Sequence, residues 1–110
     1  MRAYLGRKVD VIIDRSLASK HPNHEIYYPV NYGYLPNTKA NDGEEIDAYV
    51  LGEFIPLQEF TGYVIAIIHR FNDIEDKLVV CRELNKYSKE QIKALVEFQE
   101  RFFEIEIVTD

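Results

Sequence analysis

Hydrophobic and polar positions alternate over short stretches in the first part of the chain, a pattern typical of half-buried β-strands. Residues 9–13 (VDVII) predict a strand that ends at the polar segment DRSLASKHPNH. Residues 26–35 (IYYPVNYGYL) combine aromatic side chains with Pro29 and Gly33, so we expect an irregular or edge strand there. The segment PNTKANDG then predicts a loop.

Three further strands are predicted in the middle of the chain. IDAYVLG (46–52) forms the first, and FTGYVIAIIHRF (60–71) forms a longer one whose run VIAII indicates burial on both faces. DKLVVCREL (76–84) follows after only a short polar turn. We therefore expect the last two strands to pair as a hairpin.

A single amphipathic helix is predicted after these strands. Ser88 and Gln91 have the spacing of a capping box, which marks the start of a helix. The side chains that then recur on one helical face are Ile92, Leu95, Val96, Gln99, Phe102 and Phe103. The tail EIEIVTD alternates again and predicts a short last strand.

This order of elements predicts a mainly β (α+β) fold. A small antiparallel sheet or barrel, closed on one side by the C-terminal amphipathic helix, satisfies the pattern best. An open α+β sheet is the alternative. Because the chain has 110 residues and shows no repeat or linker, we expect one domain over residues 1–110.

The composition is that of an acidic globular protein. With 13 Lys and Arg against 19 Asp and Glu, the net charge is −6, which disfavours nucleic acid and anionic membranes as partners and favours divalent cations. Cys81 is the only cysteine, so no intrachain disulfide is expected. We find neither a signal-peptide pattern nor an apolar run near the roughly 20 residues of a membrane span, and we expect a cytoplasmic protein.

The acidic stretch DGEEID (42–47) is a candidate metal site. It places Asp42, Glu44 and Asp47 around Gly43, which is free to adopt the positive φ of a tight turn. Carboxylate oxygens suit Mg²⁺, which takes one or two of them and fills its other positions with water or substrate phosphate. Several carboxylates of this stretch can converge on one point.

A second acidic turn contains Asp73, Glu75 and Asp76 and runs directly into Lys77. Because it joins the two strands of the predicted hairpin, it can face the first turn across the mouth of a barrel. A solvated turn has the same composition, and an acidic protein must place its carboxylates somewhere. Composition alone leaves both interpretations open for each turn.

The polar segment after the first strand contains a basic cluster, Arg15, Lys20, His21 and His24. Acidic turns that hold metal ions and a basic loop that holds anionic oxygens are together what phosphoryl transfer requires, because its catalysis is mainly positioning and charge neutralisation. The tyrosines of YYPVNYGY either pack in the core or donate their hydroxyls to phosphate. The histidines lack HxH or HExxH spacing, so no catalytic histidine is expected.

The segments YPVNYGYLPNT, DGEEID and FNDIEDKLVV resemble motifs of the family I (soluble) inorganic pyrophosphatases, over roughly residues 9 to 103. Members of that family have YPxNYGY, then DGDPxD, then an Asp-rich turn that runs into a DxK or DK strand. The chain looks like a short, divergent member. The resemblance implies an OB-like five-stranded barrel with a flanking helix, Mg²⁺ as cofactor, and hydrolysis of pyrophosphate to two phosphates.

The resemblance also implies roles for individual residues. Glu44 matches the acid that helps to activate the attacking water. The positions that match metal ligands are Asp42, Asp47, Asp73 and Asp76. The positions that match phosphate-binding residues are Arg15, Lys20, Tyr32 and Lys77, although DRSLASKHP aligns with either of two family segments. Where the family has a tyrosine and a lysine late in the chain, this sequence has Phe102 and Phe103.

These departures leave two other functions open. One is a module that keeps the fold and one metal site and binds phosphate or nucleotides. The other is a hydrolase of a different phosphoanhydride or phosphoester, since a shortened rim would admit a larger substrate. In each case the ligand is pyrophosphate or a related phosphorylated small molecule, and family analogy suggests a homo-oligomer.

Overall fold

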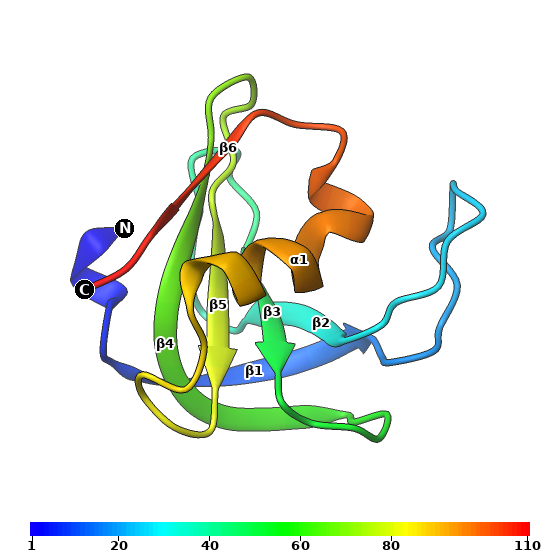
Figure 1. Ribbon diagram of the computed structural model, residues 1–110, viewed down its shortest axis with the longest axis horizontal. Helices are drawn as coiled ribbons and strands as arrows, with labels where there is room; N and C mark the ends of the chain where they lie inside the picture. The colour runs from blue at the N-terminus through cyan, green and yellow to red at the C-terminus, as the bar shows by residue number, and fades with distance from the viewer.

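The strands lie in the segments where hydrophobic alternation predicts them. In the computed structural model, which describes residues 1–110, a short 3-10 helix η1 (Arg2–Tyr4) precedes the first strand, and helix α1 (Lys89–Glu100) lies between the last two (Figure 1). The strands are β1 (Lys8–Arg15), β2 (Asn31–Leu35), β3 (Ile46–Leu51), β4 (Glu59–Arg70), β5 (Lys77–Cys81) and β6 (Ile105–Val108).

Five of these strands close into a barrel. They pair in the order β1-β2-β3-β5-β4, and β1 also pairs with β4, which completes the ring. The short strand β6 pairs with β4 outside the ring, as the alternating tail predicts. The mainly β fold with a five-stranded barrel and one C-terminal helix is therefore confirmed.

One part of the expected pairing is wrong. We expected only antiparallel pairs, but β3 and β5 run parallel, with Ala48 opposite Leu78 and Val50 opposite Val80. The reason is geometric, because a ring with an odd number of strands cannot close if every neighbouring pair is antiparallel. The predicted hairpin of β4 and β5 is confirmed.

Helix α1 begins where its cap predicts. The Ser88 hydroxyl accepts a hydrogen bond from the Gln91 backbone N–H (3.1 Å), and the Gln91 side chain accepts one from the Ser88 N–H (3.1 Å), a complete capping box. Ile92 and Val96 are fully buried against the barrel. None of the helices is both long enough and apolar enough to span a membrane.

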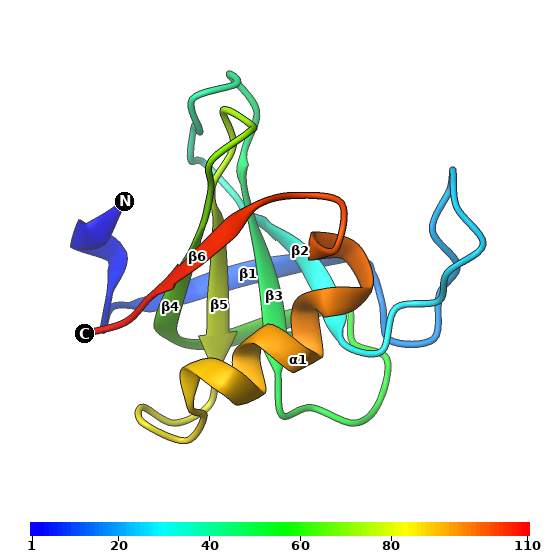
Figure 2. The same ribbon diagram turned by 45° about the horizontal axis from the view of Figure 1, so that its top comes forward.

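The alternation of side chains along the strands divides the core into two layers. Ile46, Ala48 and Val50 of β3 belong to the cluster inside the barrel, whereas Tyr49 and Leu51 belong to the cluster between the barrel and α1. Figures 1 and 2 show α1 lying across the outside of β3 and β5. Polar side chains on the helix-facing positions of these strands therefore lie near α1 and not inside the barrel.

Gly33 of the NYGY segment allows β1 and β2 to approach closely. It lies opposite Ile13, and a Cβ at this position would collide with the backbone carbonyl of Ile12. We expect Gly33→Ala to reduce the free energy of unfolding by about 3 kcal/mol, because the overpacked strand pair must separate. Urea denaturation followed by circular dichroism measures this change.

Gly43→Ala is the matched control for this substitution. Gly43 has a φ of 86°, but nothing lies within 4 Å of the added Cβ. Only the backbone strain of about 1 kcal/mol is therefore expected there. Equal losses at both positions would show that close strand approach is not what Gly33 provides.

Candidate functional site

A pocket of about 500 Å³ lies on the outer face of the barrel, between the β1–β2 loop and the C-terminal end of α1. Its barrel side is lined by charged and polar side chains from the strands and the β4–β5 turn, namely Arg15, Tyr32, Asp47, Arg70, Glu75 and Lys77. Its outer side is lined by Gln99, His21, His24, Ile26, Phe102 and Phe103. Each of the five barrel strands contributes one residue to the barrel side, and the β4–β5 turn contributes Glu75.

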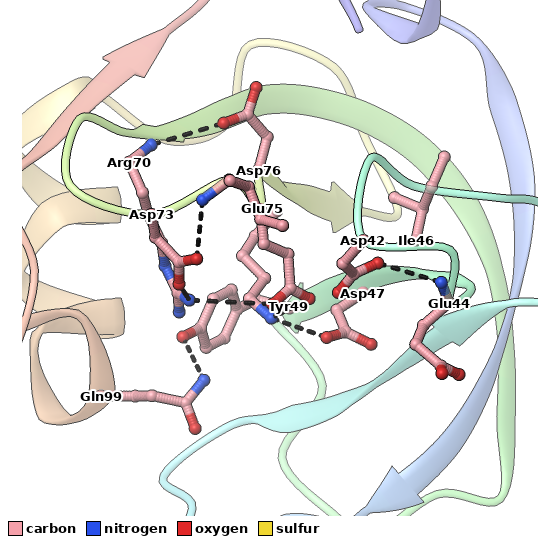
Figure 3. Close-up of polar contacts among 12 residues, drawn as sticks. Asp42, Glu44, Ile46, Asp47, Tyr49, Arg70, Asp73, Glu75, Asp76 and Gln99 are labelled. Carbon is pink, nitrogen blue, oxygen red and sulfur yellow. Dashed lines mark hydrogen bonds and ion pairs between the residues drawn. The ribbon is translucent and has the colours of Figure 1, made fainter.

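Two carboxylates converge on one lysine at the centre of this pocket. Lys77 Nζ donates to Asp47 Oδ2 (2.6 Å) and to Glu75 Oε1 (2.7 Å), and the Lys77 side chain is only 4% exposed. The parallel register of β3 and β5 places Asp47 alongside Lys77. Glu75 lies two residues before Lys77 and so extends from the same face of the chain. Figure 3 shows the side chains of Asp47 and Glu75 next to one another.

The two carboxylates titrate differently. Burial alone would raise the pKa of Asp47, but hydrogen bonding with Glu75 and the charge of Lys77 hold it below its ordinary value. Burial and then the neighbouring Asp47 raise the pKa of Glu75. As pH falls, Glu75 therefore takes up a proton before Asp47 does.

Arg15, at the end of β1, is the pocket cation that has no acidic partner. Its Nη1 donates to the Tyr28 hydroxyl (2.7 Å), and its guanidinium lies 5.8 Å from the centroid of the Tyr32 ring. No ion pair of this chain involves Arg15. Its remaining N–H groups can therefore bind an anion in the pocket.

Tyr32 lies beneath both cations. Lys77 Nζ is 5.6 Å from the centroid of its ring, so the ring stabilises the two positive charges from one side. Burial raises the pKa of Tyr32 well above its usual value. The hydroxyl therefore stays protonated at neutral pH.

Arg70 is held rigidly on the other side of the pocket. Its Nε and Nη2 donate to the two carboxylate oxygens of Glu100 (2.9 and 2.7 Å), and its Nη1 donates to Asp73 (3.1 Å). The ring of Phe103 lies 3.7 Å from the guanidinium carbon. Burial would lower the pKa of Arg70, but the hydrogen bonds that it donates to Glu100 raise it well above the ordinary value.

A chain of buried hydrogen bonds joins the two arginines beneath the pocket. The Tyr28 hydroxyl accepts from Arg15 and donates to Gln99 Oε1 (2.7 Å), and Gln99 Nε2 donates to the Tyr49 hydroxyl (2.6 Å). Tyr49 in turn donates to Glu100 Oε2 (2.6 Å), which holds Arg70. Figure 3 shows the Gln99–Tyr49 contact. The last turn of α1 thus positions cations at both ends of the site.

The structure brings together four of the residues named from the sequence and places two others on an exposed turn. Arg15, Tyr32, Asp47 and Lys77 all line the pocket. Asp42 and Glu44 are exposed before β3, where Asp42 Oδ1 accepts a hydrogen bond from the Glu44 backbone N–H (3.0 Å) (Figure 3). Neither carboxylate lines the pocket.

The other named residues are engaged elsewhere. Asp73 pairs with Arg70 at the edge of the pocket. Asp76 lies outside the pocket lining, where its carboxylate contacts His69 Nδ1 (2.9 Å) and accepts a weak hydrogen bond from the Arg70 backbone (3.4 Å). Lys20 forms an exposed ion pair with Glu25 (3.0 Å) and does not line the pocket either.

Three residues of the site were not assigned to it from the sequence. For Glu75 a signal was available, because its two-residue spacing from Lys77 predicts a shared face once β5 is recognised. Arg70 stands directly before the acidic turn, which is a weaker signal. Glu100 has no local signal, since its burial depends on how α1 packs on the barrel.

The donor set of the pocket is chemically suited to Mg²⁺. Asp47 and Glu75 supply two carboxylates, which is the number that Mg²⁺ usually takes from a protein. No group of three or more His, Cys, Asp or Glu side chains is arranged to hold a metal. Asp47 and Glu75, both hydrogen-bonded to Lys77, are the two carboxylates of the pocket lining that can offer oxygens to a metal ion.

Comparisons with known proteins identify the family and the fold of this chain. A model of the inorganic pyrophosphatase family matches residues 9–107. An inorganic pyrophosphatase of Campylobacter jejuni is 44% identical over 48 residues, covering 44% of this chain and 24% of that protein. Inorganic pyrophosphatase 1 of Pseudomonas syringae is 31% identical over 65 residues, covering 57% of this chain and 34% of that protein. The chain thus matches about a quarter to a third of the length of these relatives.

Solved structures show the same fold. The crystal structure of an inorganic pyrophosphatase from Ehrlichia chaffeensis superposes with a TM-score of 0.74 at 17% identity, over 96% of this chain and 87% of that one. The Coxiella burnetii inorganic pyrophosphatase superposes with a TM-score of 0.67 at 18% identity, over 96% and 86%. Since the family match extends over nearly the whole barrel and the helix, this chain belongs to the inorganic pyrophosphatase family.

Proposed function

We propose that this chain is a Mg²⁺-dependent hydrolase that splits inorganic pyrophosphate into two phosphates. The observation that carries the proposal is the convergence of Asp47 and Glu75 on Lys77, in a pocket that also contains the unpaired guanidinium of Arg15. Carboxylates for a hard cation and cations for phosphate oxygens then lie within one site. Family membership supports the same reaction.

Asp47 and Glu75 are the residues that would hold Mg²⁺. When bound, the ion would supply neutralisation of charge on the phosphate oxygens. Lys77 balances the two carboxylates and keeps them in the pocket, where burial would otherwise disfavour their charge. Tyr32 holds the lysine from below and narrows the positions that it can adopt.

Arg15 is the residue that we assign to the phosphate groups. Its free N–H groups match phosphate oxygens, and the hydrogen bond to Tyr28 orients its guanidinium before a ligand arrives. Burial would lower the pKa of Arg15, but the hydrogen bond to Tyr28 keeps it above its ordinary value, so Arg15 stays charged. Lys77, whose ammonium faces the same pocket, is the second phosphate-binding cation of the proposal.

Asp42, Asp73 and Asp76 as further metal ligands, Lys20 as a phosphate contact and Glu44 as the base that activates water remain predictions from the resemblance. Figures 1 and 2 show that the β2–β3 loop, which carries Asp42 and Glu44, lies at the same end of the barrel as the β4–β5 turn. We include Asp42, Glu44 and Asp73 in the proposal on that arrangement. Asp76, whose carboxylate contacts His69, and Lys20, which lies on the β1–β2 loop, are left out of it. Glu44→Gln in the assay below tests the base.

The proposal is tested by phosphate release from pyrophosphate with Mg²⁺, using two adjacent carboxylates. Glu75 lines the pocket and contacts Lys77, whereas Asp76 lies outside the lining against His69. We expect Glu75→Gln to reduce kcat/KM about 100-fold, because the site loses one of its two carboxylates. We expect Asp76→Asn to reduce kcat/KM less than about 5-fold, because the Asp76 carboxylate does not line the pocket.

Circular dichroism spectra of both variants show whether they remain folded. No phosphate release by the wild type in Mg²⁺ would refute the proposed reaction. A larger loss at Asp76 than at Glu75 would contradict the assignment of the pocket carboxylates while leaving the reaction in place.

We further propose that the protein acts in the cytoplasm, as a homo-oligomer without nucleic-acid or membrane partners. The net charge of −6 supports the last two points, since it repels polyanions. Family analogy is the support for the oligomer and for the location. Sedimentation analysis of the purified chain measures the oligomeric state.

A further inference from the structure

The outer wall of the pocket is aromatic and apolar, and hydrolysis of pyrophosphate makes no use of it. His24 and Phe102 are stacked, with ring centroids 5.4 Å apart and an interplanar angle of 18°. Ile26 and Phe103 complete this wall. Inorganic pyrophosphate presents only oxygens to its surroundings, so rings and an aliphatic side chain offer it no binding energy.

Phe102 is not a core residue. It follows the last turn of α1 and is 54% exposed, and His24 is exposed in the β1–β2 loop. The stacked pair therefore joins the β1–β2 loop to the segment that follows α1. Exposed aromatic rings at the rim of a polar site are platforms on which planar bases stack.

The two phenylalanines have different roles. Phe103 lies against the Arg70 guanidinium at 3.7 Å, so a cation–π contact accounts for its position. Phe102 has no cation against it, and His24 is its only aromatic neighbour. Phe102 is thus the phenylalanine of this wall that no cation holds in place.

The barrel side of the same pocket supplies the phosphate end of a ligand. Arg15 has free N–H groups, and the carboxylates of Asp47 and Glu75 are neutralised by Lys77. At about 500 Å³ the pocket lies in the range of sites for organic ligands, which is about 300–1,000 Å³.

We propose that this site also takes nucleoside 5′-diphosphates and binds them more tightly than inorganic pyrophosphate. The diphosphate lies at Arg15 and Lys77, and the base stacks on Phe102 at the rim. This inference rests on the proposed function for its phosphate end, because the same cations bind the phosphates in both. It adds the class of ligand, nucleoside diphosphates, that the aromatic wall of the pocket favours.

Isothermal titration calorimetry without Mg²⁺, so that pyrophosphate is not hydrolysed during the titration, tests the inference, with ADP and inorganic pyrophosphate as probes. We expect the wild type to bind ADP about 10-fold more tightly than pyrophosphate, since one stacked base is worth roughly this factor or more. In Phe102→Ala we expect the ratio of the two affinities to fall about 10-fold. AMP and ribose 5-phosphate differ only in the base. The ratio of their affinities should therefore also fall about 10-fold in Phe102→Ala.

Phe54→Ala is the matched control, because Phe54 is 84% exposed and does not line the pocket. It should keep the wild-type ratio. Equal affinities of the wild type for ADP and pyrophosphate, or an unchanged ratio in Phe102→Ala, would overturn the inference. Calorimetry measures binding without turnover, so the two proposals can fail separately. A preference for ADP that depends on Phe102, without phosphate release in the activity assay, would refute the proposed hydrolysis alone. Phosphate release without this preference would refute the inference alone.

Discussion

Asp47→Asn is expected to lower kcat/KM for Mg²⁺-dependent phosphate release from pyrophosphate about 1,000-fold. Asp47 is the pocket carboxylate that β3 itself positions, and its side chain is 29% exposed and faces Lys77 at 2.6 Å. An amide of the same shape keeps the packing but removes the charge that a metal ion requires. Lys77 would then pair with Glu75 alone and hold that carboxylate away from a cation.

The measurement is steady-state phosphate release over a range of Mg²⁺ concentrations, so that weakened metal binding and slowed turnover are separated. Asp10→Asn is the control, because Asp10 is exposed on β1 and accepts a hydrogen bond from Thr61 far from the charged pocket lining. We expect Asp10→Asn to retain wild-type rates. A loss below 10-fold in Asp47→Asn would remove Asp47 from the metal site.

Glu100→Gln is expected to reduce the free energy of unfolding by about 4 kcal/mol. The Glu100 side chain is 1% exposed and the Arg70 side chain 5%, so the substitution leaves a buried guanidinium with Asp73 at 3.1 Å and Glu75 at 4.0 Å as its acidic partners. It also weakens the acceptor of the Tyr49 hydroxyl. Breaking a buried pair costs far more than the pair contributes, since the remaining charge stays out of water.

Urea denaturation followed by circular dichroism measures this loss, and Glu97→Gln is its control. Glu97 lies on the same helix and pairs with Arg101 at 2.6 Å, but both side chains are 52% exposed. Exposed pairs of this kind contribute about 0.5 kcal/mol or less. If Glu100→Gln were no more destabilising than Glu97→Gln, the buried chain of hydrogen bonds would not be what anchors α1 to the barrel.

Local sequence features predict most of the secondary structure of this protein. The alternation in VDVII and the apolar run VIAII mark β1 and β4, and Ser88 with Gln91 marks the first residue of α1. These signals are local because they depend on side-chain period and on backbone groups a few residues away. The parallel pairing of β3 and β5 has no local signal, because it follows from the closure of five strands.

The site shows the same division. Asp47 and Lys77 were named from the sequence, and they meet in the structure at 2.6 Å. The acidic turn offered both Glu75 and Asp76, and the resemblance assigned the metal-ligand role to Asp76, whereas Glu75 is the one that lines the pocket. Only the position of β5 in the barrel decides this, since adjacent residues of an extended chain point to opposite faces.

By itself, the sequence determined the strands, the helix and its cap, and the residue types that a phosphate and metal site requires. The tertiary structure alone decided which of those residues share a pocket. It placed Glu75 beside Asp47, turned Asp76 toward His69, and buried Glu100 against Arg70. The physical reason is that side-chain period and capping act over a few residues, whereas barrel closure and helix packing bring together positions from every part of the chain.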